Sequence, residues 1–171
     1  WFLIVLALVL VVGFTQSSHL QVLGNAKLVR TSPLQRCSPG ANFKHLTSDA
    51  GTPEEGVPAV AEATAGLAWP ASVVILGMGG DGHTASLFPD SQELGLALST
   101  DEPLVAVRTP SQPQPRITFS ADRLHQAKRH ILHITGDDKR AVLANAMGGD
   151  DVRTLPIRAF LSCPLAIYWA P

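Results

Sequence analysis

ASVVILGMGGDGHTASLFPD, residues 71–90, is the stretch that decides the fold of this chain. Val73–Leu76 is a short apolar run typical of a strand covered on both faces in an α/β sheet. Glycines follow at 77, 79, 80 and 82, where backbone amides can approach a ligand, and Asp81 and His83 stand in or just after this loop. A helical turn is expected to start at His83. Ligands of open α/β sheets bind at the carboxyl ends of strands, so the loop is a candidate reaction site.

The loop also fits a purely structural turn or a nucleotide-binding motif. A glycine loop after a strand is often only a tight turn, and a single histidine is more often structural than catalytic. Residues 77–82 match the dinucleotide fingerprint G-x-G-x-x-G, but Pro89 limits the following helix to about two turns. Asp101 comes before the next predicted strand, where the fingerprint requires an acidic residue at its end. A Walker loop is excluded because no Gly-Lys-Ser/Thr follows. We therefore expect no nucleotide cofactor.

Composition narrows the function classes. The chain has 171 residues, of which 46% are hydrophobic and 16% charged, with a formal net charge of −1. Such a chain is globular and lacks the strong positive charge of a nucleic-acid binder, so an anionic ligand must be held by local cations. The histidines share no metal-ligand spacing with cysteines or carboxylates, and no metal is expected. Cys37 and Cys163 lie far apart in sequence and are expected to be reduced thiols of a cytoplasmic protein.

The amino-terminal run Trp1–Phe14 is apolar throughout apart from one glycine. We interpret it as a buried strand, because it is shorter than the ~20 residues that cross a bilayer; a membrane anchor or a signal-peptide core is the alternative. The chain begins without a methionine, which indicates a piece of a longer protein. Residues 1–24 are therefore set apart as an apolar segment and loop, and residues 25–171 are predicted to form one domain, with a first helix over Asn25–Arg30.

Strand and helix patterns alternate along the rest of the chain. Thr52 is expected to cap a helix that runs to Leu67, and the later elements are strand Leu104–Arg108, proline-rich loop Thr109–Pro115, strand Ile117–Phe119, helix Ser120–Lys128, strand His130–Thr135, helix Asp137–Met147 and strand Pro164–Trp169. This alternation predicts an α/β fold with an open, mostly parallel sheet and helices on both faces, incomplete at its amino end.

Two basic residues are candidate phosphate ligands. Arg116 leaves the proline-rich loop, and a guanidinium at a stiffened position suits bidentate binding of phosphate. Lys139 falls in the first turn of the helix Asp137–Met147, where its ammonium and the helix amides can act together. The alternative for each is an ordinary surface side chain.

The segment GMGGDGHTASLFP, residues 77–89, resembles the signature of the 6-phosphogluconolactonase family, which is similar in fold to the glucosamine-6-phosphate deaminases. The deaminases carry an asparagine and a glutamate where this chain has Ser86, Leu87 and Phe88, which favours the lactonase branch. The resemblance continues through PQPRITFS (113–120), ITGDDKRAVL (134–143), LPIRA (155–159) and IYWA (167–170). The family's upstream glycine-serine loop and acidic-arginine motif have no counterpart in this chain.

The resemblance implies hydrolysis of 6-phospho-D-glucono-1,5-lactone to 6-phosphogluconate, a step of the oxidative pentose phosphate pathway, without a cofactor or metal. It implies a small sugar phosphate as partner, no nucleic acid or membrane, a cytoplasmic location and a monomer or homodimer. Two alternatives stay open, an amino-sugar-phosphate deaminase/isomerase of the same superfamily and a catalytically degenerate fragment. We expect proton transfer by His83 and oxyanion stabilisation by the amides of Gly79, Gly80 and Gly82. Asp81 is expected either to orient the imidazole or to shape the loop as a turn aspartate bonded to its own backbone. The resemblance implies phosphate binding by Arg116, Lys128 and Lys139.

Overall fold

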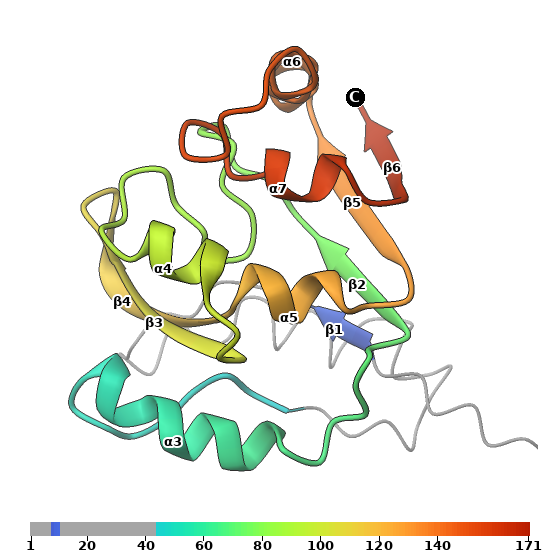
Figure 1. Cartoon of the computed structure of the whole chain (residues 1–171). Helices are drawn as coiled ribbons and strands as arrows, with labels where there is room; N and C mark the ends of the chain where they lie inside the picture. The colour runs from blue at the N-terminus through green and yellow to red at the C-terminus, as the bar shows by residue number, and fades with distance from the viewer. Residues whose placement is uncertain (1–7, 11–43) are drawn as a thin grey trace, which may run out of the picture.

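The computed structural model describes residues 8–10 and 44–171. Its centre is a parallel sheet with the strand order β1-β2-β5-β6 (Figure 1). The strands are β1 (Leu8–Leu10), β2 (Val73–Leu76), β5 (His130–Thr135) and β6 (Leu165–Ala170), each parallel to its neighbour. The predicted parallel α/β fold is confirmed.

β1 confirms the strand interpretation of the apolar run over Leu8–Leu10. The rest of Trp1–Phe14 and the predicted helix Asn25–Arg30 lie outside the described residues. Within residues 8–10 and 44–171, no helix is both long and apolar enough to span a membrane.

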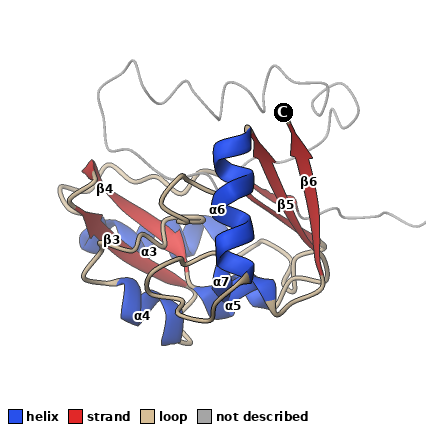
Figure 2. Cartoon of the chain, turned by 90° about the horizontal axis from the view of Figure 1, so that it is seen from above, coloured by secondary structure: helices blue, strands red, loops and turns tan. Residues whose placement is uncertain are grey.

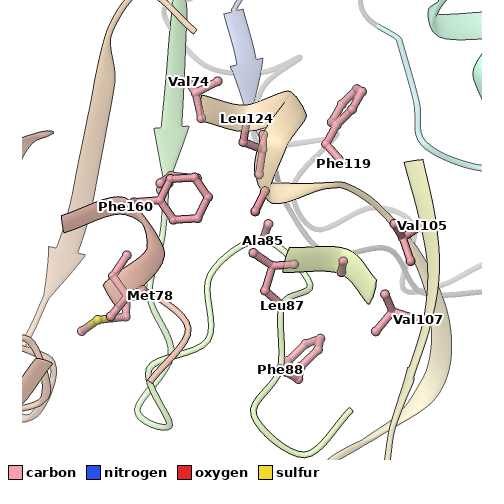
Figure 3. Packing of buried hydrophobic residues seen from close by; sticks show 14 of the residues in the cluster. Val74, Met78, Ala85, Leu87, Phe88, Val105, Val107, Phe119, Leu124 and Phe160 are labelled. Atoms are coloured by element: carbon pink, nitrogen blue, oxygen red, sulfur yellow. The ribbon is translucent and has the colours of Figure 1, made fainter. Parts of the chain in front are cut away.

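The core lies between the parallel sheet and the helices that follow its strands. Val74 and Leu76 of β2 are fully buried. They share a core with Leu124 of α5 (Ala121–His125) and Phe160 of α7 (Arg158–Leu161), as Figure 3 shows for three of these four side chains. Each such side chain contributes roughly 1.5–3 kcal/mol to stability by leaving water. This packing fixes β2, and with it the loop at its carboxyl end.

Within residues 8–10 and 44–171, the helices that accompany the parallel sheet are α5, α6 (Asp137–Met147) and α7, and Figure 2 shows them on one side of it. The strand order explains this placement, because each step from β2 to β5 to β6 moves in the same direction across the sheet. Right-handed crossovers in one direction put their helices on the same face.

A second, separate sheet carries the other half of the molecule (Figure 1). It is an antiparallel hairpin of β3 (Leu104–Thr109) and β4 (Gln112–Phe119). The hairpin packs against α3 (Pro53–Thr64) and α4 (Leu94–Ser99), and the side chain of Thr52 caps α3 by accepting a hydrogen bond from the Glu55 amide. The sequence had predicted the two strands, without assigning them to a sheet of their own.

The proline-rich segment Thr109–Pro115 is not the predicted loop. The chain turns at residues 110–111, and β4 already begins at Gln112. In a two-stranded sheet each strand pairs along one edge, so prolines within β4 are tolerated. The Asp90 carboxylate fixes the turn by accepting hydrogen bonds from the Thr109 hydroxyl and from the Ser111 amide, the latter at 2.9 Å. The predicted loop is thus a tight hairpin whose second strand presents Arg116.

Candidate active site at the end of strand β2

The glycine loop after β2 closes on itself and does not start a helix. The Gly79 amide donates to the His83 carbonyl at 2.9 Å, which joins the two ends of the loop. Ala85 has φ +52°, and Thr84 and Leu87 form an isolated antiparallel bridge. The helical turn expected at His83 is therefore wrong, because the chain makes a tight turn there and the next helix is α4.

The Asp81 carboxylate holds the His83 imidazole. Asp81 Oδ1 lies 2.6 Å from His83 Nδ1 and also accepts the His83 backbone amide at 3.1 Å. An ionised carboxylate can only accept, so a neutral imidazole must carry its proton on Nδ1. Nε2 is then left as a lone-pair nitrogen, and it has no partner among the described residues. The imidazole is 29% exposed, so this nitrogen is placed to meet a ligand or water.

Two glycines of the loop are required by close packing. A Cβ on Gly79 would overlap both the His83 ring and the Asp81 carboxylate. Gly82 has φ +75°, and a Cβ there would meet the side chain and backbone of Leu155. The Gly82 carbonyl also accepts the Ile157 amide at 2.9 Å, which ties the loop to the segment before α7. Residues 155–159, the LPIRA segment, thus hold the loop in place through the Leu155 side chain and the Ile157 amide.

The predicted oxyanion donors divide into used and unused amides. The Gly79 amide bonds the His83 carbonyl, and the Gly82 amide bonds the Gly79 carbonyl at 3.1 Å. The amides of Gly80 and Asp81 have no acceptor within the described part of the chain. Gly79 and Gly82 therefore shape the loop, and Gly80 and Asp81 present the donors that remain available.

Phe88 joins His83 to Arg116, a contact that the sequence analysis missed. The Phe88 and His83 ring centroids are 4.4 Å apart, and Arg116 Cζ lies 5.3 Å from the Phe88 centroid. The imidazole centroid and the guanidinium carbon are thus at most about 10 Å apart, and both contact the same aromatic ring. Phe88 lies in the quoted signature, but no pattern in the sequence indicates that β4 packs against it.

Arg116 is a half-buried cation without a counter-ion. Its Nη2 donates to Gln112 Oε1 at 3.2 Å, whereas its Nε is buried without a hydrogen-bond partner. No carboxylate pairs with it in the described structure, and burial lowers the pKa of its guanidinium. A cation that is partly removed from water and not neutralised by the protein attracts an anionic ligand.

The two lysines predicted to bind phosphate lie at opposite ends of the sheet. Lys139 is half-buried in the first turn of α6, just after β5, and makes no hydrogen bond or ion pair within residues 44–171. β5 lies beside β2 and runs parallel to it, so Lys139 and the glycine loop both follow the carboxyl ends of these strands. Lys128 precedes β5, and its amide bonds the Ala71 carbonyl at 2.8 Å, before β2 begins. The amino and carboxyl ends of β2, which has four residues, are roughly 13 Å apart, so the structure does not bring Lys128 to His83.

The remaining candidate groups add no metal centre. No three His, Cys, Asp or Glu side chains gather to hold a metal ion in the part of the chain that the structure describes. His130 Nε2 lies 2.9 Å from the Leu124 carbonyl, and His125 Nε2 lies 2.9 Å from the Ala159 carbonyl. Cys163 is a free thiol, and Cys37 lies outside the described residues.

These features define an α/β protein with an oriented imidazole at a parallel strand end and an unneutralised guanidinium beside it. The family profile described as "Glucosamine-6-phosphate isomerases/6-phosphogluconolactonase" matches residues 21–169. The 6-phosphogluconolactonases of Rhizobium meliloti (strain 1021) and Pseudomonas aeruginosa (strain PAO1) are each 40% identical over 86% of this chain. The crystal structure of a 6-phosphogluconolactonase from Shewanella baltica OS155 matches 96% of this chain with a TM-score of 0.87 and 34% identity, over 72% of its own length.

The chain belongs to the glucosamine-6-phosphate isomerase/6-phosphogluconolactonase family. It spans 66% of the Rhizobium relative and 63% of the Pseudomonas relative, just under two thirds of their lengths.

Proposed function

We propose that this chain hydrolyses 6-phospho-D-glucono-1,5-lactone to 6-phosphogluconate. The observation that carries the proposal is the site itself, where an imidazole oriented by Asp81 shares the Phe88 ring with the unpaired guanidinium of Arg116. A sugar phosphate lactone has a reactive ester carbon at one end and a dianion at the other. A six-carbon sugar phosphate can reach from His83 to Arg116. The names of the relatives at 40% identity support the same substrate.

His83 is the proposed general base and then the general acid. Its Nε2 takes a proton from a water molecule as the water oxygen attacks C1 of the lactone. The C1 carbonyl becomes a tetrahedral oxyanion. As the bond between C1 and the ring oxygen breaks, Nε2 returns the proton to that oxygen, which leaves a carboxylic acid that ionises in water. Asp81 stabilises the imidazolium formed between these two proton transfers.

Different parts of the proposed site bind the oxyanion and the phosphate. The amides of Gly80 and Asp81 are the proposed oxyanion donors because they have no other acceptor within the described residues. Removing one such donor elsewhere costs about 3 kcal/mol of transition-state stabilisation. The phosphate is assigned to Arg116 and to Lys139 with the first amides of α6. Lys128 is left out because it lies at the other end of the sheet.

The test measures two reactions with the 171-residue chain. We expect hydrolysis of 6-phosphogluconolactone above its spontaneous rate, and no ammonia release from glucosamine 6-phosphate. The His83→Ala variant should lose about 10²–10⁴-fold in kcat while binding of 6-phosphogluconate is retained. His133→Ala is the matched control, since it removes an exposed histidine of β5. Ammonia release would favour the deaminase, and full activity of His83→Ala would exclude this mechanism.

A further inference from the structure

Phe88 is the one side chain that contacts both His83 and Arg116 through ring interactions in the described structure. It is 1% exposed, and Figure 3 shows it at the end of the apolar core, beyond Leu87. His83 comes from the loop after β2, and Arg116 comes from the hairpin of the other sheet. Phe88 therefore lies where the two halves of the site meet.

The chemistry of a phenyl ring suits this position. A phenyl ring attracts a guanidinium and an imidazolium by cation–π interaction without adding a charge of its own. A phenyl group neither donates nor accepts a proton, so it competes neither with Asp81 for the imidazole nor with an anion for the guanidinium. Arg116 consequently stays unneutralised although its Nε is buried.

We propose that Phe88 is a positioning residue, which sets the spacing and orientation of His83 and Arg116 and thereby aligns a bound sugar phosphate with the imidazole. The inference rests on the proposed function and deepens it. Phe88 touches the two groups and not the reacting atoms, so its effect must pass through them. A purely structural residue would instead affect activity only as far as it affects folding.

The first experiment compares two buried phenylalanines that each contact a histidine. Phe160 is fully buried, and its ring centroid lies 4.6 Å from that of His125, a residue of α5 that is not part of the proposed site. Phe88→Leu and Phe160→Leu should lower the thermal unfolding midpoint by similar amounts. We expect kcat/KM for the lactone to fall about tenfold or more in Phe88→Leu and less than twofold in Phe160→Leu. Equal losses of activity in the two variants would overturn the proposal.

The second experiment is a double-mutant cycle with Arg116→Met, read out as the Kd for 6-phosphogluconate. If Phe88 acts through Arg116, Phe88→Leu should weaken binding about tenfold in the wild-type background and less than twofold in the Arg116→Met background. The same factor in both backgrounds would show that Phe88 does not act through Arg116, and would overturn the inference.

The two proposals fail in distinguishable ways. A wild-type chain that binds 6-phosphogluconate with the expected coupling but does not hydrolyse the lactone would refute the proposed function and leave the positioning role intact. Lactone hydrolysis without that coupling would refute the positioning role alone. A wild-type chain that neither binds nor hydrolyses would refute both.

Discussion

Arg108 and Arg116 stand on the two strands of one hairpin and have opposite electrostatic surroundings. Arg108 on β3 is exposed and forms an ion pair with Glu54 of α3, whose hydrogen bond raises the pKa of the guanidinium. Arg116 on β4 is half-buried and has no acidic partner within the described residues, and burial lowers the pKa of its guanidinium. The protein thus neutralises the arginine that water already solvates and leaves the desolvated one without a counter-ion. That difference supports the proposal that Arg116 binds an anionic ligand.

The largest expected effect comes from removing the Arg116 charge. Arg116→Met should raise KM for the phosphorylated lactone about 100-fold, since charged hydrogen bonds contribute about 1.5–3 kcal/mol each. Stability should not fall, because a desolvated and unpaired cation is lost. Steady-state kinetics and urea unfolding measure the two quantities.

Arg123→Met is the matched control for that variant. The Arg123 guanidinium lies 4.1 Å from the centroid of the Trp69 ring, its Nε is also buried without a partner, and burial lowers the pKa of the group. It shares with Arg116 the aromatic contact and the buried, unpartnered Nε, but among the described residues it has the Asp122 carboxylate nearby and no contact with the ring that packs on His83, so its removal should leave KM unchanged. Equal changes of KM in both variants would mean that Arg116 has no specific role in binding the phosphorylated lactone.

The loop that carries His83 depends on Gly82 for its conformation. Gly82→Ala should lower the free energy of unfolding by about 1–3 kcal/mol, because a left-handed backbone conformation and the contact with Leu155 both oppose a Cβ. Gly80→Ala is the control, since a Cβ there has open space. Chemical denaturation gives both values, and similar stabilities of the two variants would contradict the role assigned to Gly82.

The smallest expected effect is on stability, from loss of the ion pair between Arg108 and Glu54. The hydrogen bonds from Arg108 lower the pKa of Glu54 below its ordinary value of 4.5. A carboxylate with a lowered pKa contributes stability that is present above that ordinary pKa and is lost as the pH falls through the folded-state pKa. Glu54→Gln should therefore cost less than about 1 kcal/mol at pH 7, since the pair is exposed, and progressively less as the pH falls through the folded-state pKa.

Glu55→Gln is the control for Glu54→Gln, because it makes the same charge change in the same helical turn without an arginine partner among the described residues. Urea unfolding at pH 7 and at pH 3 measures the difference. A loss as large at pH 3 as at pH 7 would mean that the Glu54 side chain stabilises the fold by packing and not by charge.

Local features of this molecule were predictable, and contacts between its two sheets were not. The strand Val73–Leu76, the glycine loop and the helix Asp137–Met147 follow from short-range patterns, and the structure has each of them. The contact of Phe88 with Arg116 joins residues 28 positions apart on different elements, and only the docking of the hairpin creates it.

The errors have physical causes of the same kind. The prolines of the segment Thr109–Pro115 indicated a loop, but a two-stranded sheet tolerates them. Lys128, which the resemblance assigned to the phosphate site, stays a prediction, and the structure does not favour it because β5 carries the chain from that lysine toward the opposite end of the sheet. Predicting either feature requires the arrangement of the strands in space.

The division of the molecule into two sheets also bears on how substrate size is selected. In the proposed mechanism His83 follows a strand of the parallel sheet and Arg116 lies on the hairpin, so the packing of the two sheets sets the distance between the proposed base and the proposed phosphate ligand. Mutations that repack the hairpin against the parallel sheet would change the length of sugar phosphate that fits. On this proposal, a change in the packing of the hairpin alone would alter substrate length while the glycine loop stays the same.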